Sequence, residues 1–318
     1  MVDDYSYLYV THLLPGIRRV LTLSKQERIH HIQKDNWIGY SRAKQALKKL
    51  NDLYDHPQRH RMPNLLIIGP TNNGKTMVVE KFCRDHMPIV REPTRWIHQG
   101  KDVLVEMPVI SLQMLSTADP KRFYHSVLDK MRSIGGETVR FYLTEPFENY
   151  MVAMFEKYKV KMLIIDEIHN MLAGRKDKQR EFQNLLRYVG NALRIPIVCL
   201  GTKDAYLAIR SDPQLENRFE PFLLPLWKED EEYESLLASM VSILPLKNPS
   251  NLNYPEISRF ILEKTGGILG EIFTLLRRAA ILAIETESEV IDEKILSAVD
   301  YNSPAERIRL FEKSIVTG

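Results

Sequence analysis

Asn64-Leu-Leu-Ile-Ile-Gly-Pro-Thr-Asn-Asn-Gly-Lys-Thr-Met-Val-Val-Glu80 is the stretch that decides the fold of this chain. Its apolar run Leu65–Ile68 is typical of a strand buried on both faces, and the residues after Thr76 favour a helix. Between them, the glycine-rich turn Gly69–Thr76 has the spacing of a phosphate-binding loop. Glycines let successive backbone amides face an anion, and the following helix adds its positive end. The stretch therefore predicts a site for nucleotide phosphates.

Two side chains of this loop have predicted roles of their own. Lys75 is expected to reach the β- and γ-phosphates of ATP, and the hydroxyl of Thr76 is expected to bind Mg²⁺. A chance match on an unrelated surface loop is the alternative, which the flanking strand and helix disfavour. The predicted nucleotide-contacting residues of the loop are Gly69, Pro70, Thr71, Asn72, Asn73, Gly74, Lys75, Thr76 and Met77.

A second apolar run, Lys161–Ile165, ends in the pair Asp166-Glu167. Asp166 is predicted to hold Mg²⁺ through water, opposite Thr76, and Glu167 to orient or deprotonate the attacking water. Two adjacent carboxylates at the end of a buried strand would be costly without a cation to face. A strand that simply leaves the core into exposed acidic sequence is the alternative.

An intervening strand and a glutamate directly after Asp166 are typical of the catalytic-glutamate ATPases rather than of GTPases. The chain has no glycine shortly after Asp166, and Thr202-Lys203-Asp204 is one residue short of a guanine-specificity motif. Both observations argue against a guanine nucleotide and favour ATP with Mg²⁺ as the cofactors.

The composition is that of an ordinary soluble chain with room for two domains: 318 residues, 44% apolar, 27% charged, net charge +3. Residues 1–101 contain 17 Lys/Arg and 9 Asp/Glu, against 27 and 32 in the rest. This asymmetry indicates either an end that faces a polyanion or a solvated basic surface. Only two cysteines occur, Cys83 and Cys199, which argues for a reducing compartment. With no apolar segment of roughly 20 residues and an acidic start, the sequence predicts a cytoplasmic protein without a membrane partner.

The order of apolar runs predicts an α/β core with a five-stranded parallel sheet in three layers, followed by a small all-helical lid. The predicted strands are 65–68, 103–112, 161–166, 195–201 and 222–226. Helices are expected at 24–34, 41–50, 77–87, 119–134, 144–158, 179–193 and from 205, and in the lid at 230–244, 254–265, 269–285 and 292–299. The predicted domains are an N-terminal extension 1–36, the nucleotide-binding core 37–226, the lid 227–300 and a C-terminal tail 301–318.

Two further groups of residues are candidates for the nucleotide site. Trp37, Ile38 and Tyr40 precede the first strand and are predicted to line the adenine, with packing of the extension against the core as an equal alternative. Thr202 directly follows the strand 195–201, where its hydroxyl would touch the γ-phosphate or the attacking water. Since any strand end carries polar residues, a role in solvation only is the alternative for Thr202.

Arg218, in Asn217-Arg218-Phe219, is the candidate for an arginine that enters the site of a neighbouring subunit. Ring-forming ATPases place such a finger after the fourth strand, where it stabilises the charge of the transferred phosphoryl group. Arg210 is the rival, and an ordinary surface arginine is the alternative. If Arg218 has this role, catalysis requires a homo-oligomer.

Four of these motifs together resemble the AAA+ ATPases: Gly69–Thr76, Leu163–Asn170 (Leu-Ile-Ile-Asp-Glu-Ile-His-Asn), Leu200–Thr202 and Asn217–Phe219. The chain resembles in particular the TniB/TnsC family of transposition regulators, including those of CRISPR-associated transposons, over about residues 35–300. This resemblance implies a bacterial ATP-dependent protein that forms rings or filaments on double-stranded DNA. It also implies two protein partners, a TniQ-type target-selection protein and a DDE transposase.

The lid departs from the AAA+ pattern at one position. Many AAA+ lids carry an arginine that contacts the γ-phosphate at the start of the third lid helix, whereas this chain has Gly270-Glu271 there and its first arginine at Arg277. The departure predicts hydrolysis that is slow or stimulated by a partner.

The DNA contacts follow from the ring arrangement that the resemblance implies. Loops after the second strand would face the central channel, where Lys/Arg contacts to phosphate make affinity sensitive to salt. A solvated helix face is the alternative for each of these residues. The predicted contacts are Ser116, Thr117, Lys121, Arg122 and Arg140, with Lys130 and Arg132 behind them.

Two other functions are compatible with the sequence. The first is a different DNA-acting ATPase of the same fold, either a helicase loader or a replication initiator. A C-terminal winged-helix module would favour an initiator, and the roughly 20 residues after the lid are too few for one. The second is a signalling ATPase whose lid is a protein scaffold. Retention on plain duplex DNA separates the DNA-acting proteins from the scaffold.

Overall fold

The computed structural model describes residues 10–34, 37–91, 104–135, 146–173 and 175–316. The chain forms two compact units: Ala43–Pro225 is one, and Met1–Arg42 with Leu226–Gly318 is the other. The first unit is α/β and contains the phosphate-loop stretch, and the second is helical in its described residues. The four-part domain division stays a prediction.

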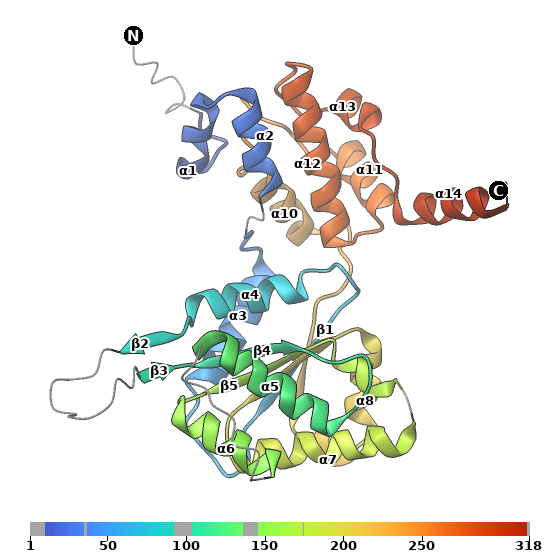
Figure 1. The fold of residues 1–318 in the computed structure, drawn as a ribbon. Coiled ribbons are helices and arrows are strands. Elements are labelled where there is room, and N and C mark those ends of the chain that lie inside the picture. Colours follow the sequence, from blue (N-terminus) through green and yellow to red (C-terminus); the bar gives the residue numbers. More distant parts are fainter. Residues whose placement is uncertain (1–9, 35–36, 92–103, 136–145, 174, 317–318) are drawn as a thin grey trace. The chain divides into compact units, whose positions relative to one another are not determined.

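A five-stranded sheet is the centre of the α/β unit (Figure 1). The strand order is β4-β5-β6-β1-β7, and each neighbouring pair is parallel. The parallel sheet of the predicted α/β fold is thus confirmed, and the carboxyl ends of the strands meet at one edge. The strands are β1 (Asn64–Ile68), β4 (Val109–Gln113), β5 (Met162–Asp166), β6 (Ile197–Gly201) and β7 (Phe219–Leu223).

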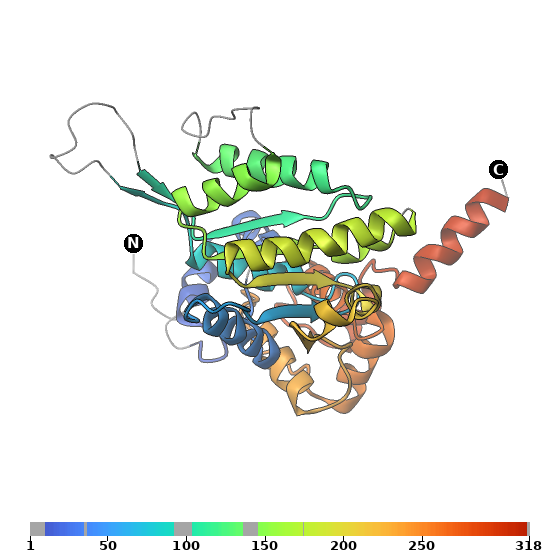
Figure 2. The same cartoon turned by 90° about the horizontal axis from the view of Figure 1, so that it is seen from below.

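Helices cover both faces of this sheet (Figure 2). One continuous apolar cluster joins α5, α6, α7 and α8 to the strand residues Leu66, Ile110, Leu163 and Cys199, whereas α3 and α4 lie on the opposite side. These layers are the three that the sequence predicted. The helices are α3 (Ser41–Tyr54), α4 (Lys75–Asp85), α5 (Pro120–Gly135), α6 (Phe147–Lys157), η4 (Ile168–Leu172), α7 (Lys176–Leu193), α8 (Lys203–Arg210) and α9 (Pro213–Glu216).

The prediction of one continuous strand over residues 103–112 was wrong. It is two strands, β3 (Leu104–Glu106) and β4, separated at Met107-Pro108. β3 pairs antiparallel with the unpredicted β2 (Ile89–Arg91) in a separate two-stranded sheet. Pro108 has no N–H to donate, and its carbonyl oxygen instead accepts from the backbone of Lys161 at 2.9 Å. The proline therefore divides the apolar run into two strands, of which β3 pairs with β2 and β4 pairs with β5.

The fifth strand was predicted too late in the chain. It spans Phe219–Leu223 rather than 222–226, because its register is set by β1, with Asn64 opposite Phe219. Pro221 is tolerated within it because β7 is the edge strand of the sheet.

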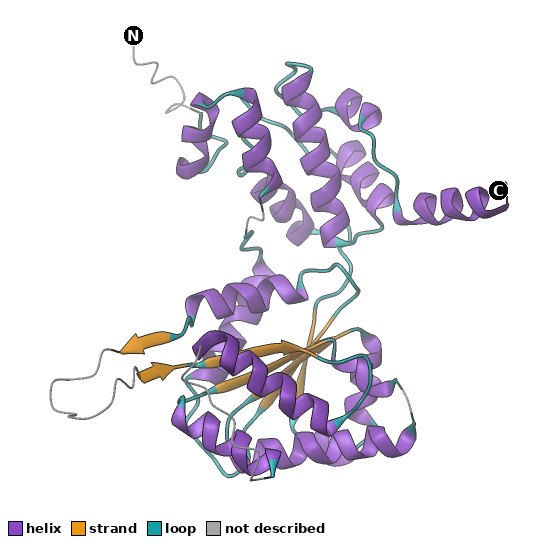
Figure 3. Cartoon of the chain, viewed as in Figure 1, coloured by secondary structure: helices purple, strands orange, loops and turns teal. Residues whose placement is uncertain are grey.

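The helical unit contains the predicted lid helices and the N-terminal helices (Figure 3). Asp230 and Asp292 cap helices rather than begin them, since their side chains accept from the backbone of Tyr233 and Ile295. No helix in the described residues is both long enough and apolar enough to cross a membrane. The elements are α1 (Pro15–Arg18), η2 (Arg19–Thr22), α2 (Lys25–Gln33), α10 (Glu231–Val241), α11 (Pro255–Thr265), α12 (Leu269–Glu285), α13 (Glu293–Ala298) and α14 (Pro304–Val316).

A buried ion pair ties the N-terminal helix α2 to the lid helices. Arg28 donates to Glu289 at 2.7 Å and to the carbonyl oxygen of Pro245 at 2.6 Å. Arg28 is 2% exposed and Glu289 7% exposed. The predicted capping box starts α2, with Ser24 N donating to Glu27 at 2.9 Å. Residues 24–33 are thus an integral part of the helical unit.

Candidate nucleotide-binding site

The phosphate-loop turn connects β1 to α4 at the carboxyl edge of the sheet. Gly74 has φ +84° and Asn72 has φ +59°, so the backbone passes through left-handed conformations just before the helix. α4 begins at Lys75, so the amino end of an eleven-residue helix follows the turn directly. This is the local geometry in which backbone amides and the helix dipole attract a phosphate.

Lys75 lies inside the turn. Its Nζ donates to the carbonyl oxygens of Gly69 at 2.9 Å and Pro70 at 2.7 Å, and the residue is 5% exposed. Burial lowers the pKa of Lys75, and the nearby carboxylates of Glu167 and Asp166 act in the opposite direction. Carbonyl oxygens are weaker partners for an ammonium group than phosphate oxygens are, so a bound triphosphate would replace them.

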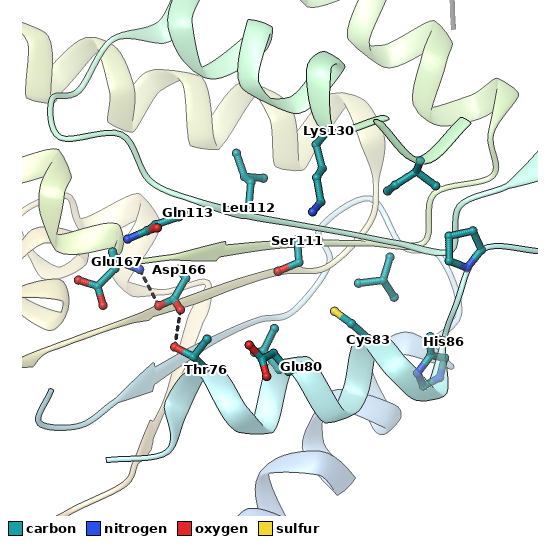
Figure 4. Close-up of a pocket in the computed structure, with 14 residues that line it drawn as sticks. Thr76, Glu80, Cys83, His86, Ser111, Leu112, Gln113, Lys130, Asp166 and Glu167 are labelled. Atoms are coloured by element: carbon teal, nitrogen blue, oxygen red, sulfur yellow. Dashed lines mark hydrogen bonds between the residues drawn. The ribbon is translucent and has the colours of Figure 1, made fainter. Parts of the chain in front are cut away.

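Thr76 and Asp166 meet across the site (Figure 4). The Thr76 hydroxyl donates to Asp166 Oδ2 at 2.7 Å, and the backbone N–H of Glu167 donates to Asp166 Oδ1 at 2.7 Å. A hydroxyl and a carboxylate are ligands that suit Mg²⁺, which keeps several waters and uses few protein groups. The described residues contain no cluster of three or more His, Cys, Asp or Glu that could hold a metal. The hydroxyl and carboxylate of this pair are thus a donor set that fits Mg²⁺.

Glu167 stands immediately beside this pair. Its backbone has φ +55°, uncommon for a residue other than glycine, and it caps the short helix η4. Its Oε2 lies 3.2 Å from His169 Nε2. The motif Leu163–Asn170 includes His169 but predicts no role for it, and the only signal in the sequence is its position two residues after the acidic pair.

A cavity of about 520 Å³ extends from these residues along α4, between α4, β4 and α5 (Figure 4). Its size falls in the range of small-molecule sites. Lys130, predicted behind the DNA contacts, instead lines this cavity and extends toward Ser111. Burial raises the pKa of the Cys83 thiol, which also lines this cavity, whereas Ser111 and Lys130 act in the opposite direction. The lining residues are Thr76, Val79, Glu80, Cys83, His86, Pro88, Val109, Ser111, Leu112, Gln113, Lys130, Ile134, Asp166 and Glu167.

Thr202 follows β6, the strand next to β1, and so lies at the same edge as the phosphate loop. It caps α8, with its Oγ1 accepting from Asp204 N at 3.4 Å. The side chain of Asn73 donates to the carbonyl oxygens of Leu224 and Pro225 at 2.8 and 2.9 Å, and the predicted nucleotide contact of this residue stays a prediction. This side chain anchors the loop to the segment after β7.

Trp37, Ile38 and Tyr40 belong to the helical unit. Ile38 and Tyr40 are buried, and Tyr40 packs edge-on against Trp227 with ring centroids 5.3 Å apart. Burial raises the pKa of Tyr40 to about 12. These contacts show a packing role for Tyr40, and the adenine contact stays a prediction.

Arg218 lies at the opposite edge of the sheet from the phosphate loop. Its carbonyl oxygen accepts from the N–H of Asn64, the first residue of β1, at 3.0 Å. The five residues of β1 place the two edges about 16 Å apart. Nη1 of Arg218 donates to Asn191 Oδ1 at 2.9 Å. The rival Arg210 pairs with Glu216 at 3.3 Å.

The positive charges around Arg218 repel one another. Burial lowers the pKa of the Arg218 guanidinium, and the neighbouring charges of Arg61 and Arg187 lower it further. Arg187 is partly compensated by Asp212 at 3.4 Å. Asp212 acts on the pKa of Arg218 in the opposite direction, so the arginines at this edge of the α/β unit are partly compensated within the chain.

The predicted DNA contacts that can be located lie on the α/β unit. Ser116, Thr117, Lys121 and Arg122 are exposed, in the loop after β4 and the first turn of α5. Arg132 is also exposed, 3.8 Å from Asp129. Arg140 lies outside the described residues.

Comparison with known proteins decides the family. The family model for the bacterial TniB protein matches residues 28–229, more than half of the chain. This chain belongs to the TniB family. The resemblance stated from the motifs is thus confirmed, and the match includes the phosphate loop, the acidic pair and Arg218. No curated protein sequence matches closely enough to refine the assignment.

Solved structures similar to this TniB family member show the fold. Cdc6p from Pyrobaculum aerophilum matches with TM-score 0.53 and 14% identity, over 82% of this chain and 67% of that one. The Aeropyrum pernix ORC2 protein matches with TM-score 0.53 and 15% identity, over 84% and 69%. Drosophila ORC matches with TM-score 0.50 and 12% identity, over 87% and 65%. The fold is that of the P-loop AAA+ proteins, as the sequence predicted.

Proposed function

We propose that this TniB family member is an ATPase that assembles as a homo-oligomer on double-stranded DNA and regulates DNA transposition. One observation carries the proposal: Lys75, inside the turn, lies beside the 2.7 Å pair of Thr76 and Asp166, with Glu167 next to it. The four side chains that phosphate binding, metal binding and water activation require are thus together at one edge of the sheet.

The roles of these residues follow from their chemistry. Lys75 and the turn hold the triphosphate, and Thr76 and Asp166 hold Mg²⁺. The ion neutralises charge that develops on the phosphoryl oxygens. Glu167 orients the attacking water and accepts its proton. The Aeropyrum pernix ORC2 protein was solved as ADPNP and ADP complexes, which supports adenine nucleotides for this fold.

The position of Arg218 supports the proposal of a homo-oligomer. With its own phosphate loop about 16 Å away along the strands, Arg218 completes the site of a neighbouring copy rather than its own. A triphosphate from that neighbour relieves the repulsion among Arg61, Arg187 and Arg218. Thr202, at the edge that carries the phosphate loop, contacts the γ-phosphate or the attacking water.

The start of α12 supports slow or partner-stimulated hydrolysis. Glu271 is 8% exposed there, and it accepts from Tyr301 at 2.8 Å and Arg307 at 2.7 Å. A buried, paired carboxylate thus occupies the position at which many AAA+ lids carry an arginine. Slow turnover suits a switch better than a motor.

Duplex DNA and two proteins are the proposed partners. Ser116, Thr117, Lys121 and Arg122 are exposed candidates for phosphate contacts, and Drosophila ORC was solved bound to DNA. Membership of the TniB family supports a DDE transposase and a TniQ-type target-selection protein as the partners, in the bacterial cytoplasm.

An electrophoretic mobility shift with plain duplex DNA tests the DNA-binding part. We expect retention that needs ATP or a non-hydrolysable analogue, that weakens steeply with salt, and that is lost in Lys75→Ala. Retention of a DDE transposase on the same DNA, in the presence of this protein, tests the regulatory part. Binding that ignores nucleotide contradicts the ATP switch, and retention without any transposase contact indicates a helicase loader or initiator instead.

A further inference from the structure

His169 connects the acidic pair to the neighbouring strand. It lies on η4, two residues after Glu167, and its Nε2 is 3.2 Å from Glu167 Oε2. The other ring nitrogen, Nδ1, is buried and has no hydrogen-bond partner among the residues that the structure describes. Such a nitrogen is uncommon, because buried polar atoms are nearly always paired. The ring is thus held at one end by a carboxylate and at the other by packing.

That packing is against the end of β6. A Cβ added to Gly201 would lie 3.1 Å from His169 Nδ1 and 2.6 Å from the Cβ of Ala205. The closest clash would be with Ala205, and the ring of His169 would also have to move by a few tenths of an ångström. Gly201 is followed directly by Thr202, so the imidazole fills the space between Glu167, on one strand end, and the backbone that carries Thr202 on the next.

The surroundings also determine where the neutral ring carries its proton. A proton on Nδ1 would be a buried donor without an acceptor in the described residues, which costs free energy. Nε2, by contrast, lies 3.2 Å from Oε2 of Glu167, so a proton on this nitrogen has a carboxylate nearby. The Nε2–H tautomer is therefore the favoured one, and it attracts the carboxylate.

We propose that His169 is a positioning residue, which holds the carboxylate of Glu167 in a fixed place relative to Thr202. The proposal rests on the proposed ATPase function. His169 itself touches neither nucleotide nor metal in this arrangement. Without it, Glu167 keeps its backbone position but its side chain is free to rotate, so ATP still binds and the attacking water is poorly oriented.

Two substitutions separate the Nε2 contact from simple packing. In His169→Leu we expect kcat for ATP to fall about 10- to 100-fold, with the KM and the dissociation constant for ATP within about twofold of wild type. His169→Gln should recover most of the loss, because its amide nitrogen reaches nearly as far as Nε2. His31→Leu on α2 is the matched control, since His31 also has a buried ring nitrogen without a partner in the described residues. Its kcat should equal that of wild type.

Either of two kinetic results overturns the proposal. An unchanged kcat in His169→Leu shows that Glu167 needs no positioning by this ring. A glutamine variant as slow as the leucine variant shows that only the shape of the ring matters. Thermal unfolding of each variant identifies any that fails to fold.

A spectroscopic test does not depend on hydrolysis. With ¹⁵N-histidine in the full chain, and the signals of His169 assigned by their loss in His169→Gln, two-bond ¹H–¹⁵N spectra should show the Nε2–H tautomer. In Glu167→Ala the Nε2 resonance should shift. An Nδ1–H tautomer, or resonances that ignore Glu167→Ala, overturns the inference. If wild type hydrolyses no ATP while the spectra are as expected, the ATPase proposal fails and the His169 contact stands.

Discussion

At the scale of single residues, the candidate nucleotide site is centred on Lys75, whose ammonium group donates to backbone carbonyl oxygens, which are weaker partners than phosphate oxygens. Lys75 is buried, its pKa is lowered by that burial, and two carbonyl oxygens hold its ammonium group. In the proposed site, Lys75 is therefore already placed to make charge-assisted hydrogen bonds to a triphosphate.

Lys75→Ala is therefore expected to weaken ATP binding by at least about 100-fold, since it removes hydrogen bonds between charged groups. Titration calorimetry with ATP and Mg²⁺ measures the affinity. Lys81→Ala is the control, because Lys81 lies on the same helix and pairs with Asp85 on the exposed side. An ATP affinity in Lys75→Ala equal to that of the control would remove Lys75 from the site.

Glu167 separates binding from chemistry. In Glu167→Gln the amide keeps the size of the side chain but cannot accept a proton, so kcat should fall by about 10²- to 10⁴-fold while ATP affinity stays the same. The variant should stay on DNA longer than wild type. Glu80→Gln, also in the cavity wall, is the control with normal turnover. Normal turnover in Glu167→Gln as well would mean that another group activates the water.

At the scale of elements, the parts that were predicted correctly are those whose signal is local. β1, β5 and β6 are apolar runs, each followed by a polar turn, and the Ser24–Glu27 capping box marks the start of α2. The residues that were missed depend on contacts between distant segments. β7 takes its register from β1, and His169 gains its role only from Gly201, 32 residues later. β2 and β3 have three residues each, too short for a periodicity to show.

The pair Arg28–Glu289 gives a prediction at the same scale. Removing one partner of a buried ion pair leaves the other charge unpaired, so Glu289→Gln should lower the free energy of unfolding at pH 7 by about 3–5 kcal/mol. Urea unfolding measures it. Glu287→Gln is the control, because Glu287 pairs with Lys25 at the surface. Equal stability of the two variants would show that the buried pair contributes nothing.

The same carboxylate makes stability depend on pH. Burial opposes its charge, but hydrogen bonds from Arg28 prevail and lower the pKa of Glu289 below 4.5. A carboxylate with a depressed folded pKa contributes stability that is complete above its unfolded pKa and is lost as pH falls through the folded value. The pKa of an unperturbed glutamate is about 4.3. As the pH falls from about 5 to about 3, the free energy of unfolding of wild type should therefore decrease by more than that of Glu289→Gln. If the free energy of unfolding decreased equally in wild type and in Glu289→Gln, the lowered pKa of Glu289 would be contradicted.

At the scale of the whole molecule, each chain offers two different edges of one sheet. The carboxyl edge carries the phosphate loop, and the amino edge carries Arg218 with Arg61 and Arg187. In the homo-oligomer that we propose, a head-to-tail arrangement of copies would join the first edge to the second, and such an interface would repeat into rings or filaments. Neither edge would then be a complete catalytic site by itself.

Mixing two inactive variants tests this sharing. Arg218→Ala and Lys75→Ala should each hydrolyse ATP at about 0.1% of the wild-type rate or less, in line with the roughly 10³-fold loss expected for a missing arginine finger. Their mixture should regain activity, because the Lys75 variant supplies Arg218 to intact loops of the other. Arg210→Ala, which removes an arginine paired on its own surface, is the control with near-normal activity. A mixture no faster than its components would argue against an arginine that acts in a neighbour.

Electron microscopy of the protein with duplex DNA and a non-hydrolysable ATP analogue tests the shared site most directly. We expect copies in a ring or helical filament around the duplex. In each interface, the analogue and Mg²⁺ should lie against Lys75, Thr76 and Asp166 of one copy, with Arg218 of the next copy at its γ-phosphate. Single chains on the DNA, or an analogue bound away from the turn 69–76, would contradict a nucleotide site shared between copies.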